Sequence, residues 1–254
     1  MSGHSKWKTI KHQKGAADAK RGQLFTKLAR DIVLAIRQGG GGGDPDMNFR
    51  LRLALDKAKS GNMPAETIDR AVKRGTGEGG EGESLEEILY EGYGPGGAAI
   101  MLQAVTSNRN RTASEVRATF SKIGTALGES GCVAWNFDSR GLITLETDAD
   151  KAEDIALLAI DAGAEDVQVD GSYVEVFTLS EKLMMVKEGL EAQGLQVSTA
   201  ELSMIPRTTI SLETKDAEQT LRLLDMLEDL DDAQKVYTNA DFPEAVLESY
   251  RGSG

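Results

Sequence analysis

The sequence has few of the residues from which metal sites and many enzyme sites are built. It contains one cysteine, Cys132, and two histidines, His4 and His12, in 254 residues. A single cysteine excludes a disulfide framework and a cysteine-based zinc cluster, and it is typical of a reducing cytoplasm. The two histidines lie near the N-terminus without a cysteine beside them, which is a poor geometry for a metal site. We therefore expect neither a metal nor a cofactor.

Long apolar runs and nucleotide-binding motifs are also missing. No run approaches the roughly 20 residues that span a bilayer, and the polar N-terminus does not resemble a signal peptide. There is no GxxxxGK(S/T) loop, and the formal GxGxxG at Gly77, Gly79 and Gly82 follows a predicted helix instead of a strand. The glutamates inside that motif would repel a pyrophosphate. These absences predict a cytoplasmic protein that is not an enzyme and has no membrane partner.

Charge is abundant but unevenly distributed. The chain has 29 Lys and Arg against 41 Asp and Glu, a net charge of −12. Residues 1–75 hold 16 of these cations and 7 of the anions, a net of +9, so residues 76–254 have a net of −21. Such asymmetry is typical of a module that faces nucleic acid and is attached to an acidic body. A basic bundle that only pairs with the acidic domains would give the same counts.

Apolar spacing predicts three helices in the basic part. Leu24, Leu28, Ile32 and Ile36 recur every four residues and predict a helix over residues 16–38, which the glycines at 39–43 end. A second helix is expected after Asp44-Pro45, and a third begins after Pro64 and stops at Gly75. Residues 1–14, the arm, have too few apolar side chains to form a core.

The acidic part alternates between strand and helix patterns. Residues 141–205 follow a β-α-β-β-α-β order, which predicts a ferredoxin-like domain. On either side we expect a strand at Ala98–Val105, a helix opened by a Thr112–Glu115 capping box, a strand at Val133–Phe137 and a hairpin turn at Asp138–Gly141. A β-α-β pattern at 208–238 completes this outer part.

The predicted fold class is therefore multi-domain α+β: an N-terminal three-helix domain followed by two ferredoxin-like α+β domains, one inserted in the other. The expected segments are a basic arm and helical domain at 1–75, a Gly/Glu-rich linker at 76–83, a split α+β domain at 84–140 and 206–254, and an inserted domain at 141–205.

Two basic features stand out as candidate nucleic-acid contacts. The first is the arm with the following helix, where cations surround Trp7, an aromatic side chain that could stack on an exposed base. Trp7 could instead dock on the helical bundle. The second is the loop Asn108–Thr112 at a predicted helix start, where two arginines and free backbone N–H groups could seat a phosphate. Its arginines could instead pair with the acidic body. The candidate binding residues are Lys6, Trp7, Lys8, Lys11, His12, Lys14, Lys20, Arg21, Lys27, Arg30, Arg109 and Arg111.

The remaining reactive side chains are interpreted as structural. Cys132 lies among small apolar residues at a predicted strand start, and a buried thiol is expected there instead of a nucleophile. The acidic clusters at Glu86-Glu87 and Asp229–Asp232 lie in or beside predicted helices and are interpreted as solvated faces.

Several long blocks carry a resemblance to a known family. GHSKWKTIKHQKGAADAKRGQLFTKLARDI, DPDMNFRLRLALDKAKSGNMP, YEGYGPGGAAIMLQAVTSNRNRTASEVRATFSK and VYTNAD together resemble the YebC family, nearly from end to end. That family includes bacterial probable transcriptional regulators and the mitochondrial translational activator of cytochrome oxidase subunit I. The resemblance implies a helical domain plus two α+β domains and a non-enzymatic cytoplasmic protein acting on gene expression.

Three functions remain open from the sequence. The first is a DNA-binding transcriptional regulator, which the family description favours. The second is a ribosome-associated translation factor that contacts ribosomal RNA, for example where consecutive prolines are translated; the stacking aromatic and the basic loops on two domains favour it. The third is a protein-interaction scaffold. The first two functions share one prediction: the protein binds nucleic acid and regulates gene expression.

Overall fold

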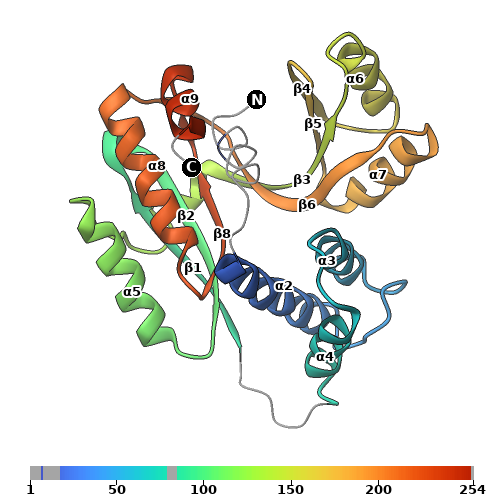
Figure 1. Ribbon diagram of the computed structural model, residues 1–254, viewed down its shortest axis with the longest axis horizontal. Coiled ribbons are helices and arrows are strands. Elements are labelled where there is room, and N and C mark those ends of the chain that lie inside the picture. The colour runs from blue at the N-terminus through green and yellow to red at the C-terminus, as the bar shows by residue number, and fades with distance from the viewer. Residues whose placement is uncertain (1–6, 8–17, 79–84, 253–254) are drawn as a thin grey trace. The chain divides into compact units, whose positions relative to one another are not determined.

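The structure is a computed structural model, and it describes residue 7, residues 18–78 and residues 85–252 (Figure 1). Contacts between residues divide the chain into two units. Residues 137–207 form one of them, called the inserted unit below, and the chain on either side of it forms the other. Within this second unit we distinguish the helical module, residues 18–78, from the split domain, residues 85–136 and 208–252.

The helical module contains three helices, α2 (Asp18–Gln38), α3 (Phe49–Ser60) and α4 (Ala65–Thr76). Apolar side chains at i and i+4 on α2 pack against the other two helices; they include Leu28, Ile32 and Ile36. Asn48 begins α3 by accepting a hydrogen bond from the Leu51 N–H at 3.1 Å. The three predicted helices are thereby confirmed.

The split domain is built on a three-stranded antiparallel sheet in the order β1-β2-β8, with two helices along one face (Figure 1). Its elements before the inserted unit are β1 (Glu86–Tyr93), η1 (Pro95–Gly97), β2 (Ala99–Thr106), α5 (Arg109–Lys122) and η2 (Ala134–Asn136). Those after it are β7 (Ile210–Ser211), α8 (Thr214–Glu228), β8 (Ala233–Thr238), β9 (Ala240–Asp241) and α9 (Glu244–Gly252). Side chains of α5, α8, β2 and β8 form a single core.

Two expectations for this domain are wrong. Glu86 and Glu87 do not lie beside a helix, because they begin β1, which pairs with β2 along its whole length. Because the strand begins with exposed acidic residues, its start lacks the apolar pattern by which a strand is normally recognised in a sequence. The expected strand at Val133–Phe137 is instead the short 3-10 helix η2 leading into a longer strand.

The inserted unit has a four-stranded antiparallel sheet in the order β4-β5-β3-β6 and two helices, the ferredoxin-like arrangement (Figure 1). Its elements are β3 (Phe137–Glu146), α6 (Ala152–Asp161), β4 (Asp166–Asp170), β5 (Tyr173–Thr178), η3 (Ser180–Lys182), α7 (Leu183–Ala192) and β6 (Val197–Pro206). The hairpin turn expected at Asp138–Gly141 is wrong, because these residues continue β3 and pair with β6. The α+β fold class, with a helical region followed by β-rich domains, is confirmed.

The two ends of the inserted unit lie beside each other. Phe137 pairs with Pro206 at the end of the β3–β6 ladder, and Arg207 binds the Asp138 carboxylate at 2.7 Å. In the split domain, Asn136 and Thr208 join the same two chain segments. The Asn136 amide donates to the Thr208 carbonyl at 3.0 Å and accepts from the Thr208 N–H at 3.0 Å and hydroxyl at 2.8 Å.

Candidate nucleic-acid interface

Two of the candidate cations on α2 contact the split domain. Lys27 donates to the carbonyl oxygen of Glu228, and Arg30 donates to that of Asp231. Gln23, on the same helix, donates to the Asp231 carboxylate at 3.2 Å. These bonds fasten α2 to the segment that links α8 to β8. Part of the basic face of α2, which the charge count assigned to nucleic acid, therefore binds the split domain instead.

The centre of this contact is the carboxylate of Asp232, of which only 1% is exposed. Arg30 lies 3.1 Å from it, and Arg111 lies 2.7 Å from it on the side of α5. Burial by itself raises the pKa of Asp232, but hydrogen bonds from Thr112, Arg111 and Thr106, with the charge of Arg30, outweigh burial and lower that pKa. Asp232 is thus an ionised internal partner of the predicted binding residues. The interpretation of the Asp229–Asp232 cluster as a solvated face is wrong for Asp232.

The predicted phosphate seat at the start of α5 is filled by the chain's own side chains. The helix begins at Arg109, and Asn108 caps it by accepting from the Arg111 N–H at 3.1 Å. Thr112 is buried and donates its hydroxyl to Asp232 at 2.6 Å, so the expected capping box at Thr112–Glu115 is wrong. Arg109 remains exposed at this helix start.

Trp7 lies in a different place from either expectation. Its side chain is 0% exposed, and it belongs to the core of the split domain, together with residues of α5, α8 and α9. The prediction that it stacks on a base is wrong, because a fully buried indole presents no face to a ligand. It does not dock on the helical bundle either, since the core of that bundle is a separate cluster.

The remaining candidates are described incompletely or lie on the surface. Arg21 is exposed on the first turn of α2. Lys20 belongs to α2, but its side chain lies outside the described part. The candidates of the arm that also lie outside the described residues are Lys6, Lys8, Lys11, His12 and Lys14. Residues 79–84, which include two glycines of the formal GxGxxG, are outside the described part as well.

A second set of cations on α3 and α4 was not among the candidates. These side chains are exposed and belong to the helical module: Arg50, Lys59, Arg70 and Lys73. Arg50 lies over the ring of Phe49, with its guanidinium carbon 5.6 Å from the ring centre. The signal for them was present in the sequence as cations on the faces left over by the apolar positions of these helices.

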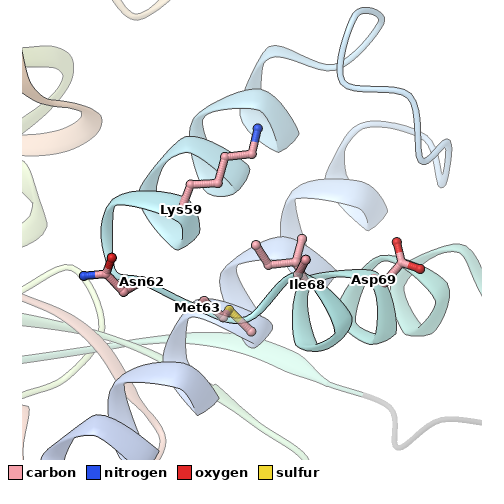
Figure 2. Close-up of a pocket in the computed structure, with 6 residues that line it drawn as sticks. Lys59, Asn62, Met63, Ile68 and Asp69 are labelled. Atoms are coloured by element: carbon pink, nitrogen blue, oxygen red, sulfur yellow. The ribbon is translucent and has the colours of Figure 1, made fainter.

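A shallow pocket of about 540 Å³ lies where α3 turns into α4. Figure 2 shows Lys59 from α3 and Asp69 from α4 at its rim, with Met63 and Ile68 between them. One cation, one anion, the amide of Asn62 and apolar side chains do not form a catalytic arrangement. Of the residues that line the pocket, only Lys59 belongs to the set of exposed cations on α3 and α4.

Neither a metal site nor a membrane-spanning helix is found in the part of the chain that the structure describes. No three His, Cys, Asp or Glu side chains there are grouped so that they could hold a metal ion. None of the described helices is both long and apolar enough to cross a membrane.

Comparison with known proteins identifies relatives along nearly the whole chain. A "Probable transcriptional regulatory protein" of Roseiflexus castenholzii is 53% identical over 253 residues, which is 98% of this chain and 99% of that protein. A protein of the same name from Chloroflexus aurantiacus is 55% identical over 243 residues, or 95% and 96% of the two chains. The crystal structure of a conserved hypothetical protein from Aquifex aeolicus superposes with a TM-score of 0.81 at 46% identity, covering 89% of this chain and 93% of that one.

The same assignment comes from domain comparison. Residues 5–78 match the N-terminal domain of the TACO1/YebC protein, and residues 85–240 match the second and third domains. The resemblance seen in the sequence blocks is confirmed, and the chain belongs to the TACO1/YebC family.

Proposed function

We propose that this protein is a nucleic-acid-binding regulator of gene expression, and that it acts on DNA as a transcriptional regulator. The observation that carries the proposal is the separation of charge, +9 in residues 1–75 against −21 in the rest of the chain. Relatives named probable transcriptional regulatory proteins support it. In this proposal the protein acts in the cytoplasm, without enzymatic activity.

The proposed contact surface is the basic arm together with the exposed cations of α3 and α4. Lys27, Arg30 and Arg111 are placed outside it, because they already bind backbone carbonyls or Asp232. Arg109 stays within it as an exposed cation. Those that the structure describes are spread over two helices and a loop, and the sequence of these helices has no recognition-helix pattern of Arg, Asn or Gln grouped for base edges. This distribution favours contacts to phosphates, which hold the protein on the duplex without selecting a sequence.

The proposal is tested by fluorescence anisotropy with a labelled DNA duplex across a range of salt concentrations. A variant carrying Arg50→Gln, Lys59→Gln, Arg70→Gln and Lys73→Gln should bind more weakly. The slope of log affinity against log salt should become shallower by roughly 0.9 for each lost phosphate contact. A matched control removes four exposed cations elsewhere: Lys122→Gln, Lys182→Gln, Lys215→Gln and Arg222→Gln. Equal loss in both variants would show that net charge, not this surface, governs binding.

A second arm of the experiment separates DNA from the ribosome as the target. The same titrations are repeated with double-stranded and single-stranded RNA, and cell extract is sedimented before and after ribosome dissociation. Binding to DNA, with no co-migration with ribosomal particles, supports the proposal. Co-migration that survives DNase treatment would contradict it and favour the translational alternative.

A further inference from the structure

Two exposed aromatic side chains of the split domain are fixed by the same atom. Tyr93, at the end of β1, and Trp135, in η2, are 44% and 62% exposed. The Tyr93 hydroxyl and the Trp135 indole N–H both donate to the carbonyl oxygen of Cys132, each at 2.9 Å. We call Tyr93 and Trp135 the aromatic pair. Both polar groups are satisfied within the protein, so what the pair presents outward is the apolar surface of its rings.

The loop beneath the pair is held by a buried carboxylate. Glu91, 3% exposed, accepts hydrogen bonds from the N–H groups of Gly131 at 2.7 Å, Val133 at 2.9 Å and Ala134 at 2.7 Å. Burial by itself raises the pKa of Glu91, but these three donors outweigh burial and lower it, so the carboxylate stays charged. The Glu91 carbonyl also accepts from the Gly128 N–H at 2.8 Å. The loop is thus anchored on both sides of Cys132.

An exposed tryptophan on an anchored loop is a costly feature for folding alone. Burying a side chain of this size in a core is strongly stabilising. Because most of the Trp135 surface is in water, the folded protein gains little of that stabilisation. Rigid aromatic side chains lose little conformational entropy when a partner covers them. For this reason tryptophan and tyrosine dominate the residues that carry binding energy at protein interfaces.

The charges around the pair select the sign of the ligand. Two carboxylates, Glu91 and Glu129, act on this loop: after burial, which is the larger cause, their negative charge raises the pKa of the Cys132 thiol. Glu129 is exposed on the same loop. A field of this sign opposes a phosphate and attracts a cation, and the face of an indole ring attracts cations as well.

We infer that the aromatic pair is a docking site for a cationic side chain of a protein partner, an arginine or lysine that lies on the Trp135 ring with Glu129 nearby. This site is separate from the proposed nucleic-acid surface and does not depend on it. An arginine would use both features of the site, since its planar guanidinium stacks on aromatic rings and pairs with carboxylates. The proposed partner is therefore a basic segment of another protein.

Intrinsic fluorescence gives a direct test on the full-length protein. The chain has two tryptophans, and Trp7 is fully buried, so dissolved quenchers report Trp135. Iodide is intrinsically the stronger quencher, so each ion is compared with its own quenching of free N-acetyltryptophanamide. Relative to that reference, caesium should be favoured over iodide, because the local field is negative. A preference for iodide on the same scale would overturn the electrostatic part of the inference.

Binding is then measured with defined probes. A peptide of alternating glycine and arginine, with both termini blocked so that they carry no charge, should change the Trp135 emission. A glycine–glutamate peptide and a short oligothymidine should not. Calorimetry should show binding weakened about tenfold by Trp135→Ala and weakened less by Glu129→Gln. Glu218→Gln, which removes an exposed acid on α8, should leave affinity unchanged. The emission of buried Trp7 and the circular dichroism spectrum verify that Trp135→Ala is folded.

Two results would contradict the inference. Equal affinity of the arginine peptide for the wild type and for folded Trp135→Ala would show that the peptide binds the acidic surface generally. Quenching of Trp135 by the oligothymidine, without a response to the arginine peptide, would assign the pair to nucleic-acid stacking instead.

Discussion

Arg30 and Asp232 form an ion pair of 3.1 Å that joins the helical module to the split domain. The carboxylate is buried and is shared with Arg111, whose side chain is half exposed. Asp232, in the segment before β8, therefore binds Arg30 of α2 and Arg111 of α5 at the same time. The stability of this part of the protein should therefore depend on Asp232 more than on either arginine.

Asp232→Ala is expected to lower the free energy of unfolding by about 3–5 kcal/mol, because it leaves cations without their buried partner. Arg111→Ala should cost less, since this side chain is already half in water and Arg30 continues to pair with Asp232. Urea unfolding followed by circular dichroism measures both. Asp229→Ala, at an exposed neighbouring acid, is the control and should have little effect. Similar losses for Asp229→Ala and Asp232→Ala would contradict the role given to the ion pair.

Acid should remove the contribution of Asp232. Its folded-state pKa lies below its ordinary value, so its contribution is complete above the unfolded pKa of about 3.9 and is lost as the pH falls through the folded pKa. Asp232→Asn should be less stable than the wild type at neutral pH. The difference between the two should shrink as the pH falls below about 4. Urea unfolding at a series of pH values tests this, and a difference that does not change with pH would refute it.

Asn136→Ala should destabilise the split domain by about 1–3 kcal/mol, because Asn136 is buried and its loss leaves polar groups of Thr208 without these partners. Asn110→Ala, at an exposed position of α5, is the matched control and should change stability little. Thermal unfolding of both variants decides the question. Equal melting temperatures would show that water replaces the lost bonds at no cost.

Gly96 and Gly124 separate two effects of adding a side chain. Both have a positive φ, 66° and 79°, so alanine is strained at either position. At Gly96 the added Cβ would also lie 2.7 Å from a methyl group of Leu212, whereas at Gly124 nothing lies within 4 Å. Gly124→Ala should cost about 1–2 kcal/mol, and Gly96→Ala clearly more. Chemical denaturation compares them, and equal costs would mean that Leu212 moves aside freely.

Local patterns were sufficient to predict the inserted sheet and every helix from α2 to α8, whereas α9 (Glu244–Gly252) was not predicted. Leu28, Ile32 and Ile36 mark the buried side of α2 because an apolar residue at every fourth position fits only one helical face. In the inserted unit, the strand and helix patterns predicted the order β-α-β-β-α-β, and the structure has this order. The start of β1 was missed because its first residues are exposed acids.

Partners far apart in the sequence could not be predicted. Nothing near Trp7 indicates which core it joins, because the other buried members of that core lie far along the chain, between Ala98 and Leu247. Likewise, Arg30 and Arg111 were recognised as cations, but their shared partner Asp232 lies more than a hundred residues from each. The sequence identified charged side chains of the site, and only the tertiary contacts separate those engaged internally from those on the surface.

The position of the inserted unit also sets an order of events during synthesis. Translation delivers the chain from its N-terminus, and the inserted unit is complete at Arg207. At that moment β1 and β2 exist, but β8, which covers the other side of β2, begins only at Ala233. Until then β2 has an open edge, and unpaired strand edges are sites of aggregation. A nascent chain interrupted between these points would carry one finished domain and one exposed edge.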